Sequence, residues 1–361
     1  VSILVDSGIT RPHRLCASFS MMRPAIYNSE SELPQDATRI DALRSAYREL
    51  FFIEHPQASK VDTAETDIDA FFGARAEQYV WVHYPWHRIA VRIPDEATYF
   101  KLRTARNRNL ITSEEQKVYR DAIVGIAGLS VGSAAAATIV STGGPRRIKL
   151  ADPDTIEISN LNRMRATLAH VGTNKADVAA RGIWDIDPFA DVEIWDKGVD
   201  VDGLGRFISD PRLSVFVDEM DDIALKIASR TACRARGIPV VMATDNGDGA
   251  ILDVERYDIE PNRPIFHGRV SIDEAIERGD REQFVRLANQ IIDPKLFTSR
   301  QLESVKAIGV SLSGVAQIAT GASIAGAAVA YAVRAIVCNF ELSSGRYLLS
   351  TEDSLRAGIS L

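Results

Sequence analysis

The sequence predicts an α/β fold: a Rossmann-like, mostly parallel sheet with helices on both faces, preceded by a smaller mixed α+β N-terminal module. Two observations predict the larger part. From residue 112 onwards, short apolar runs alternate with amphipathic stretches, as they do where helices wrap both faces of a parallel sheet. A glycine-rich loop follows the first of these runs, at the place where such sheets bind nucleotides. The 361 residues, 46% of them hydrophobic, are enough for more than one core.

The N-terminal module is predicted to occupy residues 1–105, and its sequence gives no sign of its role. Thr38–Phe52 has apolar residues at helical spacing, so we expect a helix there. Tyr79–Tyr84 and His87–Ile93 read as strands on either side of Pro85, which predicts a hairpin. The histidines of this module lack the spacing of metal ligands.

Residues 106–250 are predicted to form a nucleotide-binding core. Thr112 and Glu115 make a capping box that opens a short helix. The elements expected after it are the strand Ala122–Ala127, the helix Ser133–Ser141, the strand Arg147–Ala151, the helix Lys175–Ile186, the strands Val192–Trp195 and Leu213–Val217, the helix Ile223–Arg236 and the strand Pro239–Ala243.

Residues 251–361 are predicted to complete the sheet and to contain a crossover region and a buried helix. Ser311–Val333 carries no charged residue, so its length alone would suit a membrane span. Its apolar residues are mostly Ala and Gly, which contribute little to insertion. We therefore expect a helix packed in the core or at a dimer interface, and no membrane contact.

Composition narrows the function further. A net charge of −7 argues against a broad nucleic-acid-binding surface and favours small-molecule, peptide or protein partners. The cysteines Cys16, Cys233 and Cys338 are scattered, without a C-x-x-C pair for zinc or dithiol chemistry. The first residues meet Asp6 too early for a signal-peptide core. We expect a cytoplasmic protein.

The loop after the first core strand is the first candidate site. Its relevant residues are Gly125, Gly128, Gly132 and Ser133. Glycines at a strand-to-helix turn let backbone N–H groups approach a phosphate at the helix N-terminus. The spacing is irregular, because Ala127 and Ser130 stand near expected glycines, and glycines at such a turn also serve packing alone.

Two carboxylates follow at the end of the next strand. Asp152 lies 20 residues beyond Gly132, a spacing that suits a carboxylate accepting both ribose hydroxyls. Asp154 comes two residues later. The plainer interpretation is an acidic turn at a strand end, and an NAD-type site also remains open at this point.

Amides and cations then distinguish the two kinds of nucleotide. ATP cleavage needs cations to neutralise charge on the departing pyrophosphate, whereas a dinucleotide needs only its pyrophosphate held at the helix end. Arg163 and Lys175 supply such cations, and Asn160 and Asn162 supply amides beside them. Alternatively, Lys175 opens a solvated helix and Arg163 pairs with Glu157.

An acidic run, residues 218–222, follows another predicted strand at the same edge of the sheet. Mg²⁺ prefers one or two carboxylates together with substrate phosphates, so this run is a candidate magnesium site. The alternative is an acidic loop that caps the next helix.

These four pieces, in this order, resemble the ThiF/MoeB superfamily of ATP-dependent adenylating enzymes, the bacterial relatives of ubiquitin-activating enzymes. The resemblance rests on D-x-D-x-x-x-x-S-N-L-x-R, Asp152 to Arg163, and on V-G-x-x-K, which ends at Lys175. It implies that Asp152 binds the ATP ribose and that Asn160 and Arg163 contact phosphates. It also implies that Lys175 contacts phosphate near the substrate and that Asp221 holds Mg²⁺.

Two further segments carry the resemblance. Arg106–Ile111 is similar to the segment whose arginine, here Arg108, reaches the partner subunit's ATP in this family, which implies a homodimer. Pro261–Gly268 resembles an uncharacterised bacterial branch that also has an N-terminal extension. His267 in this segment is a candidate for lining an acceptor site, or else a structural histidine.

The chain departs from the family pattern at several places. The usual Asn after the magnesium aspartate is Asp222, and the familiar Arg of the next helix is Lys226. These changes point either to retuned phosphate contacts or to a catalytically inactive dimeric scaffold. Residues 248–310 contain no cysteine to form a thioester, and Cys233 falls within a predicted helix, where a buried, inert thiol is expected.

The sequence therefore favours an adenylyltransferase that uses ATP and Mg²⁺ to activate a carboxylate as an acyl-adenylate. By resemblance, the carboxylate is the C-terminus of a peptide or of a small ubiquitin-like or sulfur-carrier protein. The alternatives are the inactive scaffold and an NAD-dependent oxidoreductase, which would leave Arg163, Lys175 and Asp221 without a role.

Overall fold

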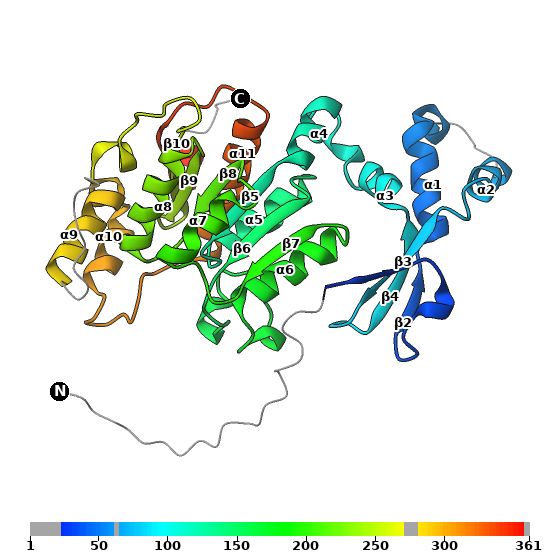
Figure 1. Cartoon of the computed structure of the whole chain (residues 1–361), viewed down its shortest axis with the longest axis horizontal. Helices are drawn as coiled ribbons and strands as arrows, with labels where there is room; N and C mark the ends of the chain where they lie inside the picture. Colours follow the sequence, from blue (N-terminus) through cyan, green and yellow to red (C-terminus); the bar gives the residue numbers. More distant parts are fainter. Residues whose placement is uncertain (1–22, 61–64, 271–280, 357–361) are drawn as a thin grey trace, which may run out of the picture.

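The computed structural model describes residues 23–60, 65–270 and 281–356. Figure 1 shows a small sheet at one end of the molecule and a larger, helix-covered sheet beside it. The first 22 residues, Cys16 among them, lie outside the described residues. Residues 271–280 of the predicted crossover region lie outside them as well.

The small sheet belongs to the N-terminal part and has the strand order β1-β3-β4-β2. Its strands are β1 Ala25–Tyr27, β2 Thr38–Asp41, β3 Tyr79–Tyr84 and β4 Ile89–Pro94. The helices around it are α1 Leu43–Glu54, α2 Glu65–Gly73 and α3 Glu96–Arg103, with short 3-10 turns η1 Glu30–Glu32, η2 Pro56–Lys60 and η3 Ala105–Asn107. The predicted hairpin is confirmed, since β3 and β4 pair antiparallel from Tyr79 to Tyr84.

One predicted helix begins too early. Thr38–Asp41 is a strand that pairs parallel with β4, and the helix starts only at Leu43. The Asp41 carboxylate accepts a hydrogen bond from the Leu43 backbone N–H, which starts the helix after the strand ends. The sequence does not reveal this boundary because all four strand residues are exposed and show no alternation.

The N-terminal part is fixed to the core by a mixed apolar and ionic contact. The Trp86 ring lies 6.1 Å from that of Trp184, centroid to centroid. Asp187, buried in the core, forms ion pairs with Arg103 and with Arg120. Removing one partner of such a buried ion pair lowers the free energy of unfolding by roughly 3–5 kcal/mol. The small sheet is therefore held against the end of the helix that precedes Asp187.

The large sheet has the order β11-β10-β9-β8-β5-β6-β7. Its strands are β5 Ile123–Ala127, β6 Arg147–Ala151, β7 Asp191–Trp195, β8 Val215–Asp218, β9 Val240–Asp245, β10 Gly249–Glu255 and β11 Gly345–Ser350. Strands β5 to β9 run parallel; β10 pairs antiparallel with β9, and β11 pairs antiparallel with β10. The Rossmann-like, mostly parallel sheet is confirmed.

Helices cover both faces of this sheet (Figure 1). They are α4 Ser113–Asp121, α5 Gly132–Ser141, α6 Lys175–Ile186, α7 Val201–Ser209, α8 Ile223–Ala235, α9 Arg281–Ile292, α10 Ser299–Lys306, α11 Ala319–Val337 and α12 Thr351–Arg356. Shorter 3-10 turns are η4 Ile158–Asn160, η5 Leu168–His170, η6 Ile265–Gly268 and η7 Pro294–Leu296. Side chains of α5, α6 and α11 form one core, and those of α7, α8 and α9 form the other.

The charge-free helix predicted over Ser311–Val333 is α11, which starts later, at Ala319. It is the one helix of the described residues with the length and apolar composition to cross a membrane, but 61% of its most apolar window is buried in the protein. It packs against α5, where Gly326 lies directly over Ala134: a Cβ on Gly326 would lie 2.8 Å from the Ala134 Cβ. Only a glycine allows this approach.

This contact makes a stability prediction. In an open helix interior, Gly→Ala stabilises by about 1 kcal/mol because alanine is the better helix former. At Gly326 we expect the opposite sign, a loss of about 1–3 kcal/mol, because the new methyl group overpacks the α5 contact. The measurement is the free energy of unfolding in urea. The control is Gly182→Ala in α6, where a Cβ would meet nothing within 4 Å. Equal stability of the two variants would contradict the packing argument.

Strand order sets the place of a ligand site. The chain passes from β5 to β6 and β7 on one side, and then returns to β8 and β9 on the other. The carboxyl ends of β5, β6 and β8 therefore surround a topological switch point, where open α/β sheets bind ligands.

Candidate nucleotide-binding site

The glycine loop lies at this switch point, between β5 and α5. Gly128 has φ +88, and a Cβ there would lie 2.2 Å from the Glu219 carbonyl oxygen, so the position requires glycine. Gly132 and Ser133 begin α5, whose N-cap residue Val131 makes no side-chain cap. The first N–H groups of α5 are thus left for an anion.

Gly125 has a different task. It lies inside β5, where a Cβ would come within 2.5 Å of Leu213 and 2.8 Å of Phe207. The missing side chain makes room for the core on the α7 face. The geometry thus supports core packing at Gly125, and at Gly128 a positive φ with close packing against the backbone of the loop after β8.

Asp152 is buried at the end of β6 and holds the glycine loop in place. Its Oδ2 accepts a hydrogen bond from the Leu129 N–H at 2.7 Å, and its Oδ1 accepts one from the Asp154 N–H at 2.9 Å. Burial raises the pKa of this carboxyl, against the opposing effect of these two hydrogen bonds. Asp152 therefore positions the loop and also places a carboxylate at the switch point.

Arg163 lies against the glycine loop. Its Nε donates to Ser130 Oγ at 3.1 Å, which joins the motif segment 152–163 to the loop 125–133. Nη1 is held by the Ser159 carbonyl and by Asn162 Oδ1. Arg163 does not pair with Glu157, so the alternative suggested by the sequence is wrong. Its guanidinium is held beside the start of α5, where phosphates are expected.

Lys175 is buried rather than solvated, which excludes the other alternative. Its Nζ donates to Asp154 Oδ2 at 2.8 Å and lies 4.0 Å from Asp152 Oδ1. Asn174, the N-cap of α6, donates to the Asp152 carbonyl at 3.0 Å and fixes the lysine's backbone beside the acidic turn. Asn160, also buried, accepts from the Glu157 N–H and shapes the turn between these groups. The geometry thus brings Lys175 to both carboxylates.

The acidic run separates into structural and free carboxylates. Asp218 is buried and pairs with Arg230 and with Lys226, whose Nζ lies 3.3 Å from Asp218 Oδ1. Glu219 Oε1 accepts from the Ala243 N–H at 2.9 Å. Asp222 caps α8 by accepting from the Leu225 N–H at 3.0 Å, a task that an asparagine would also perform. The departures at Asp222 and Lys226 therefore keep a cap and a cation.

Asp221 is the acid of this run that remains for a metal. It is exposed at the carboxyl edge, and its carboxylate enters no hydrogen bond within the described ranges. Those ranges hold no group of three or more His, Cys, Asp or Glu side chains that suits a metal. Mg²⁺ needs only one or two carboxylates when phosphates and water complete its shell, so Asp221 fits this ion.

Arg108 lies away from this site. The neighbouring Asn107 donates to the Thr142 carbonyl at 3.0 Å, at the C-terminal end of α5. Helix α5 has 10 residues and so spans about 15 Å from there to the glycine loop. The exposed Arg108 side chain is too short to cross that distance to the nucleotide edge of its own subunit.

The two remaining side chains of interest are structural. Cys233 is fully buried in α8, as expected, and burial raises the pKa of its thiol. His267 lies in η6 at φ 58, where Nε2 contacts Asp253 Oδ1 at 2.9 Å and Nδ1 contacts Arg263 at 3.0 Å. These contacts account for His267 without an acceptor site.

Sequence reasoning missed Ser130, Asn174, Asp245 and Gln317 as members of this edge. Asn174 was recognisable as a helix N-cap directly before Lys175. Ser130 looked like a defect in the glycine pattern, although its hydroxyl is what contacts Arg163. Asp245 and Gln317 carry no local signal, because their contact joins residues 72 positions apart.

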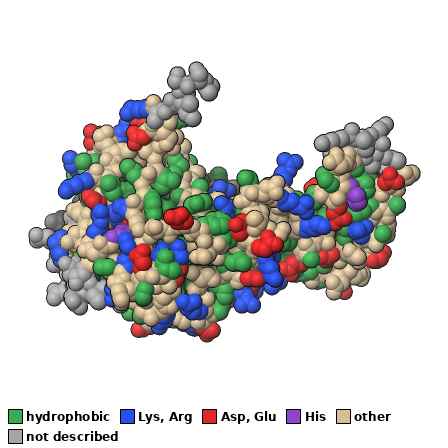
Figure 2. Space-filling view, turned by 90° about the horizontal axis from the view of Figure 1, so that it is seen from above, with side chains coloured by type: hydrophobic (Ala, Val, Ile, Leu, Met, Phe, Trp, Pro, Cys, Tyr) green, Lys and Arg blue, Asp and Glu red, His purple; other side chains and the backbone are tan. Residues whose placement is uncertain are grey.

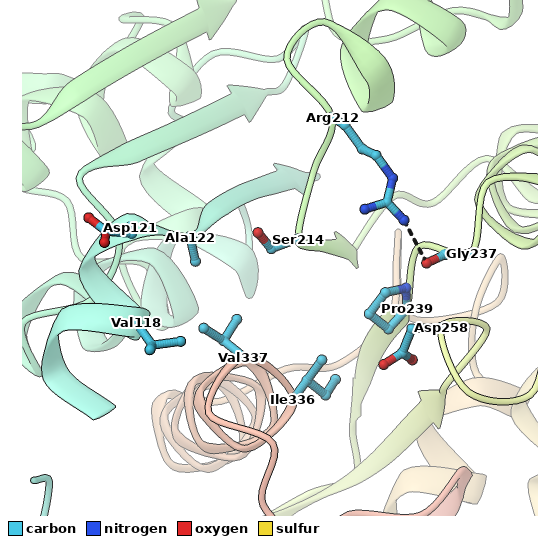
Figure 3. A pocket seen from close by; sticks show the side chains of 10 residues that line it. All are labelled: Val118, Asp121, Ala122, Arg212, Ser214, Gly237, Pro239, Asp258, Ile336 and Val337. Carbon is cyan, nitrogen blue, oxygen red and sulfur yellow. Dashed lines mark hydrogen bonds between the residues drawn. The ribbon is translucent and has the colours of Figure 1, made fainter. Parts of the chain in front are cut away.

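The groove in Figure 3 is a different place. It has a volume of about 440 Å³ and lies at the amino ends of β5, β8 and β9, where Ala122, Ser214 and Pro239 line it. Arg212 donates to the Gly237 carbonyl at its rim. This is the edge of the sheet opposite the glycine loop, so the groove is separate from the nucleotide site.

Comparisons with known proteins agree with this geometry. The model of the ThiF family matches residues 104–353. The uncharacterized protein MT1398 of Mycobacterium tuberculosis (strain CDC 1551 / Oshkosh) is 37% identical over 278 residues, which cover 76% of this chain and 38% of that protein. Ubiquitin-like modifier-activating enzyme 5 of Drosophila ananassae is 26% identical over 161 residues, 42% of this chain and 40% of that enzyme. The chain thus spans about two fifths of the length of these relatives.

A solved structure shows the same fold. The crystal structure of E. coli tRNA N6-threonylcarbamoyladenosine dehydratase, TcdA, in complex with AMP has a TM-score of 0.50 and 21% identity to this chain. The match covers 68% of this chain and 97% of that one. Since the family match takes in both sides of the switch point and most of the chain, the protein belongs to the ThiF family of ATP-using, ubiquitin-activating-like adenylating enzymes.

Proposed function

We propose that the chain uses MgATP to convert a carboxylate into an acyl-adenylate with release of pyrophosphate. The observation that carries this proposal is the placement of Arg163 against the glycine loop, through Ser130, while Lys175 lies beside Asp152 and Asp154 at the same edge. A dinucleotide oxidoreductase would not need two held cations here. An enzyme that expels pyrophosphate does.

In the proposed reaction, a carboxylate oxygen attacks the α-phosphorus, and the bond from that phosphorus to the β-phosphate oxygen breaks. The carboxylate is already ionised at neutral pH, so no base is needed. Asp152 binds the ribose, and the α5 N-terminus and Asn160 hold phosphates. Arg163 and Lys175 neutralise charge on the leaving pyrophosphate. Asp221 would hold Mg²⁺, which would supply further charge neutralisation.

The partners remain part of the proposal. We infer a homodimer in which Arg108 reaches the second subunit's ATP, because it cannot reach its own. We further propose a cytoplasmic protein whose substrate is the C-terminal carboxylate of a peptide or small protein. Figure 2 shows acidic and basic side chains interspersed over one face of the described residues, which suits such partners better than nucleic acid.

Exchange of radiolabelled pyrophosphate into ATP tests the reaction directly. The protein is incubated with MgATP, labelled pyrophosphate and a panel of short peptides with free C-termini. We expect exchange that requires both the peptide and a free carboxylate, since C-terminally amidated versions of the same peptides cannot attack.

Two results would overturn the proposal. The first is tight NAD binding with no exchange for any carboxylate, which would favour the oxidoreductase. The second is calorimetric ATP binding that Arg163→Ala and Asp221→Ala leave unchanged, without exchange, which would favour the inactive scaffold.

A further inference from the structure

Asp245 is an acid at the nucleotide edge that the proposed reaction leaves without a role. It ends β9, the strand next to β8, so it lies beyond the loop that carries Asp221. Along the carboxyl edge the order is therefore the ribose carboxylate on β6, the glycine loop on β5, the metal carboxylate after β8, and Asp245 on β9. Asp245 stands at the end of the row farthest from the ribose.

The two carboxylate oxygens of Asp245 differ. Oδ2 accepts a hydrogen bond from Gln317 Nε2 at 2.9 Å. Oδ1 is buried and has no hydrogen-bond partner in the part of the chain that the structure describes. The residue as a whole is 5% exposed. An unpaired buried acceptor is costly, by about 1–3 kcal/mol, so it is retained where some other group uses it.

Gln317 connects this carboxylate to the nucleotide motif. Asn162 Nδ2 donates to the Gln317 carbonyl at 2.8 Å, so the same residue contacts both the motif segment and Asp245. Two hydrogen bonds thus hold Gln317 beside Arg163, whose charge also acts on Asp245. A side-chain amide of the protein already occupies one oxygen of Asp245.

The charge state of Asp245 is compatible with an acceptor. Burial raises its pKa to about 6, while the Gln317 hydrogen bond and the Arg163 charge oppose this rise. The group is therefore mostly ionised at neutral pH and accepts, rather than donates, hydrogen bonds.

We propose that Asp245 Oδ1 accepts a hydrogen bond from an N–H group of the substrate, the amide N–H on the carbon that carries the reacting carboxylate. This inference rests on the proposed adenylation. It makes Asp245 a specificity-determining residue that selects the C-terminal residue of a peptide over a simple carboxylic acid. Gln317 keeps its hydrogen bond to Oδ2, so the unpaired Oδ1 is the oxygen left for the substrate N–H.

A buried carboxylate that accepts a hydrogen bond can distinguish a peptide C-terminus from a simple carboxylic acid, which apolar contacts cannot do. A site built to pair a substrate N–H rejects an analogue without it, because the buried carboxylate is then left unpaired. A second carboxylate or an ester oxygen at the same place would face a like charge or a lone pair. Asp245 therefore favours a donor.

The test uses two stable mimics of an acyl-adenylate. One is 5′-O-[N-(N-acetylglycyl)sulfamoyl]adenosine, and the other replaces its glycyl N–H by an ester oxygen of nearly the same size. Their dissociation constants, and that of AMP, are measured by calorimetry on the full chain. We expect the dissociation constant of the amide mimic to be at least about tenfold lower than that of the ester mimic. This is the effect of one hydrogen bond to a charged group.

Three variants separate the possible causes. In Asp245→Asn, the side-chain oxygen of the asparagine keeps the hydrogen bond from Gln317, and its NH₂ group takes the place of Oδ1. This group cannot accept the substrate N–H, so the preference for the amide mimic over the ester should vanish. The affinity for AMP should stay the same. Gln317→Ala should keep the preference, because it removes the hydrogen bond to Oδ2 and leaves Oδ1 in place. Asp248→Asn, a neighbouring exposed acid that contacts Thr320, is the matched control and should change nothing.

The outcomes distinguish this inference from the proposed function. If neither mimic binds more tightly than AMP and no carboxylate supports exchange, adenylation itself is wrong. If both mimics bind tightly but equally, or if Asp245→Asn keeps the preference, adenylation stands and the role of Asp245 is wrong.

Discussion

Replacing Arg163 with alanine is expected to lower the rate of carboxylate-dependent pyrophosphate exchange by about 10²–10³-fold, the usual cost of one preorganised charge-stabilising group. The arginine is held beside the glycine loop by three hydrogen bonds, to Ser130, Ser159 and Asn162. Because it is positioned before the reaction begins, it stabilises charge on the pyrophosphate without reorganisation. The substitution removes no buried ion pair, so the fold should persist.

The control is Arg165→Ala, which removes the same charge two residues away from an exposed position. It should keep exchange within about twofold, since an exposed charge at that distance is largely screened. Arg163→Lys keeps the charge but loses the forked contact with Ser130 and Asn162, so an intermediate rate is expected. Exchange in Arg163→Ala close to that of Arg165→Ala would contradict the assigned role.

The sequence predicted elements best where local patterns decide structure. Helix Lys175–Ile186 has the predicted bounds, and the Thr112–Glu115 capping box is present. The prediction missed α7, whose Gly203 and Gly205 weaken any helix signal, although its apolar side chains pack against the sheet. Tertiary burial, rather than local propensity, forms that helix.

In the candidate site, too, the sequence predicted the residues that one local motif contains, but not the contacts between distant segments. The motif gave Asp152, Arg163 and Lys175, because spacing within one segment is visible in sequence. It did not show that Lys175 is buried, or that Ser130 holds Arg163. Such contacts depend on how β5 and β6 lie side by side, which brings residues 33 positions apart into hydrogen-bond distance. The contact between Asn162 and Gln317 spans 155 positions and had no sequence signal.

Replacing Arg230 with methionine is expected to reduce the free energy of unfolding by about 3–5 kcal/mol, because it leaves buried carboxylates without their cation. The Arg230 side chain is fully buried, pairs with Asp218, and donates from Nε to Glu255 Oε2 at 2.6 Å. Its guanidinium also lies 3.9 Å from the centre of the Phe266 ring. Methionine fills a similar volume, so the loss comes from charge rather than from a cavity. Arg236→Met, at the exposed end of α8, is the control and should change stability by no more than about 0.5 kcal/mol.

The pH dependence of this loss identifies its cause. Burial raises the pKa of Asp218, but Lys226 and Arg230 outweigh that effect and hold it below its usual value. In the unsubstituted protein this stabilisation is present above the unfolded pKa and is lost as pH falls through the folded one. Without Arg230, the pKa of Asp218 rises, so mild acid protonates the carboxyl and removes the unpaired charge. The stability difference between Arg230→Met and the unsubstituted protein, measured by urea unfolding, should therefore shrink from pH 7.5 towards pH 5. A difference that stays constant over this range would mean that lost packing, and not an uncompensated carboxylate, destabilises the variant.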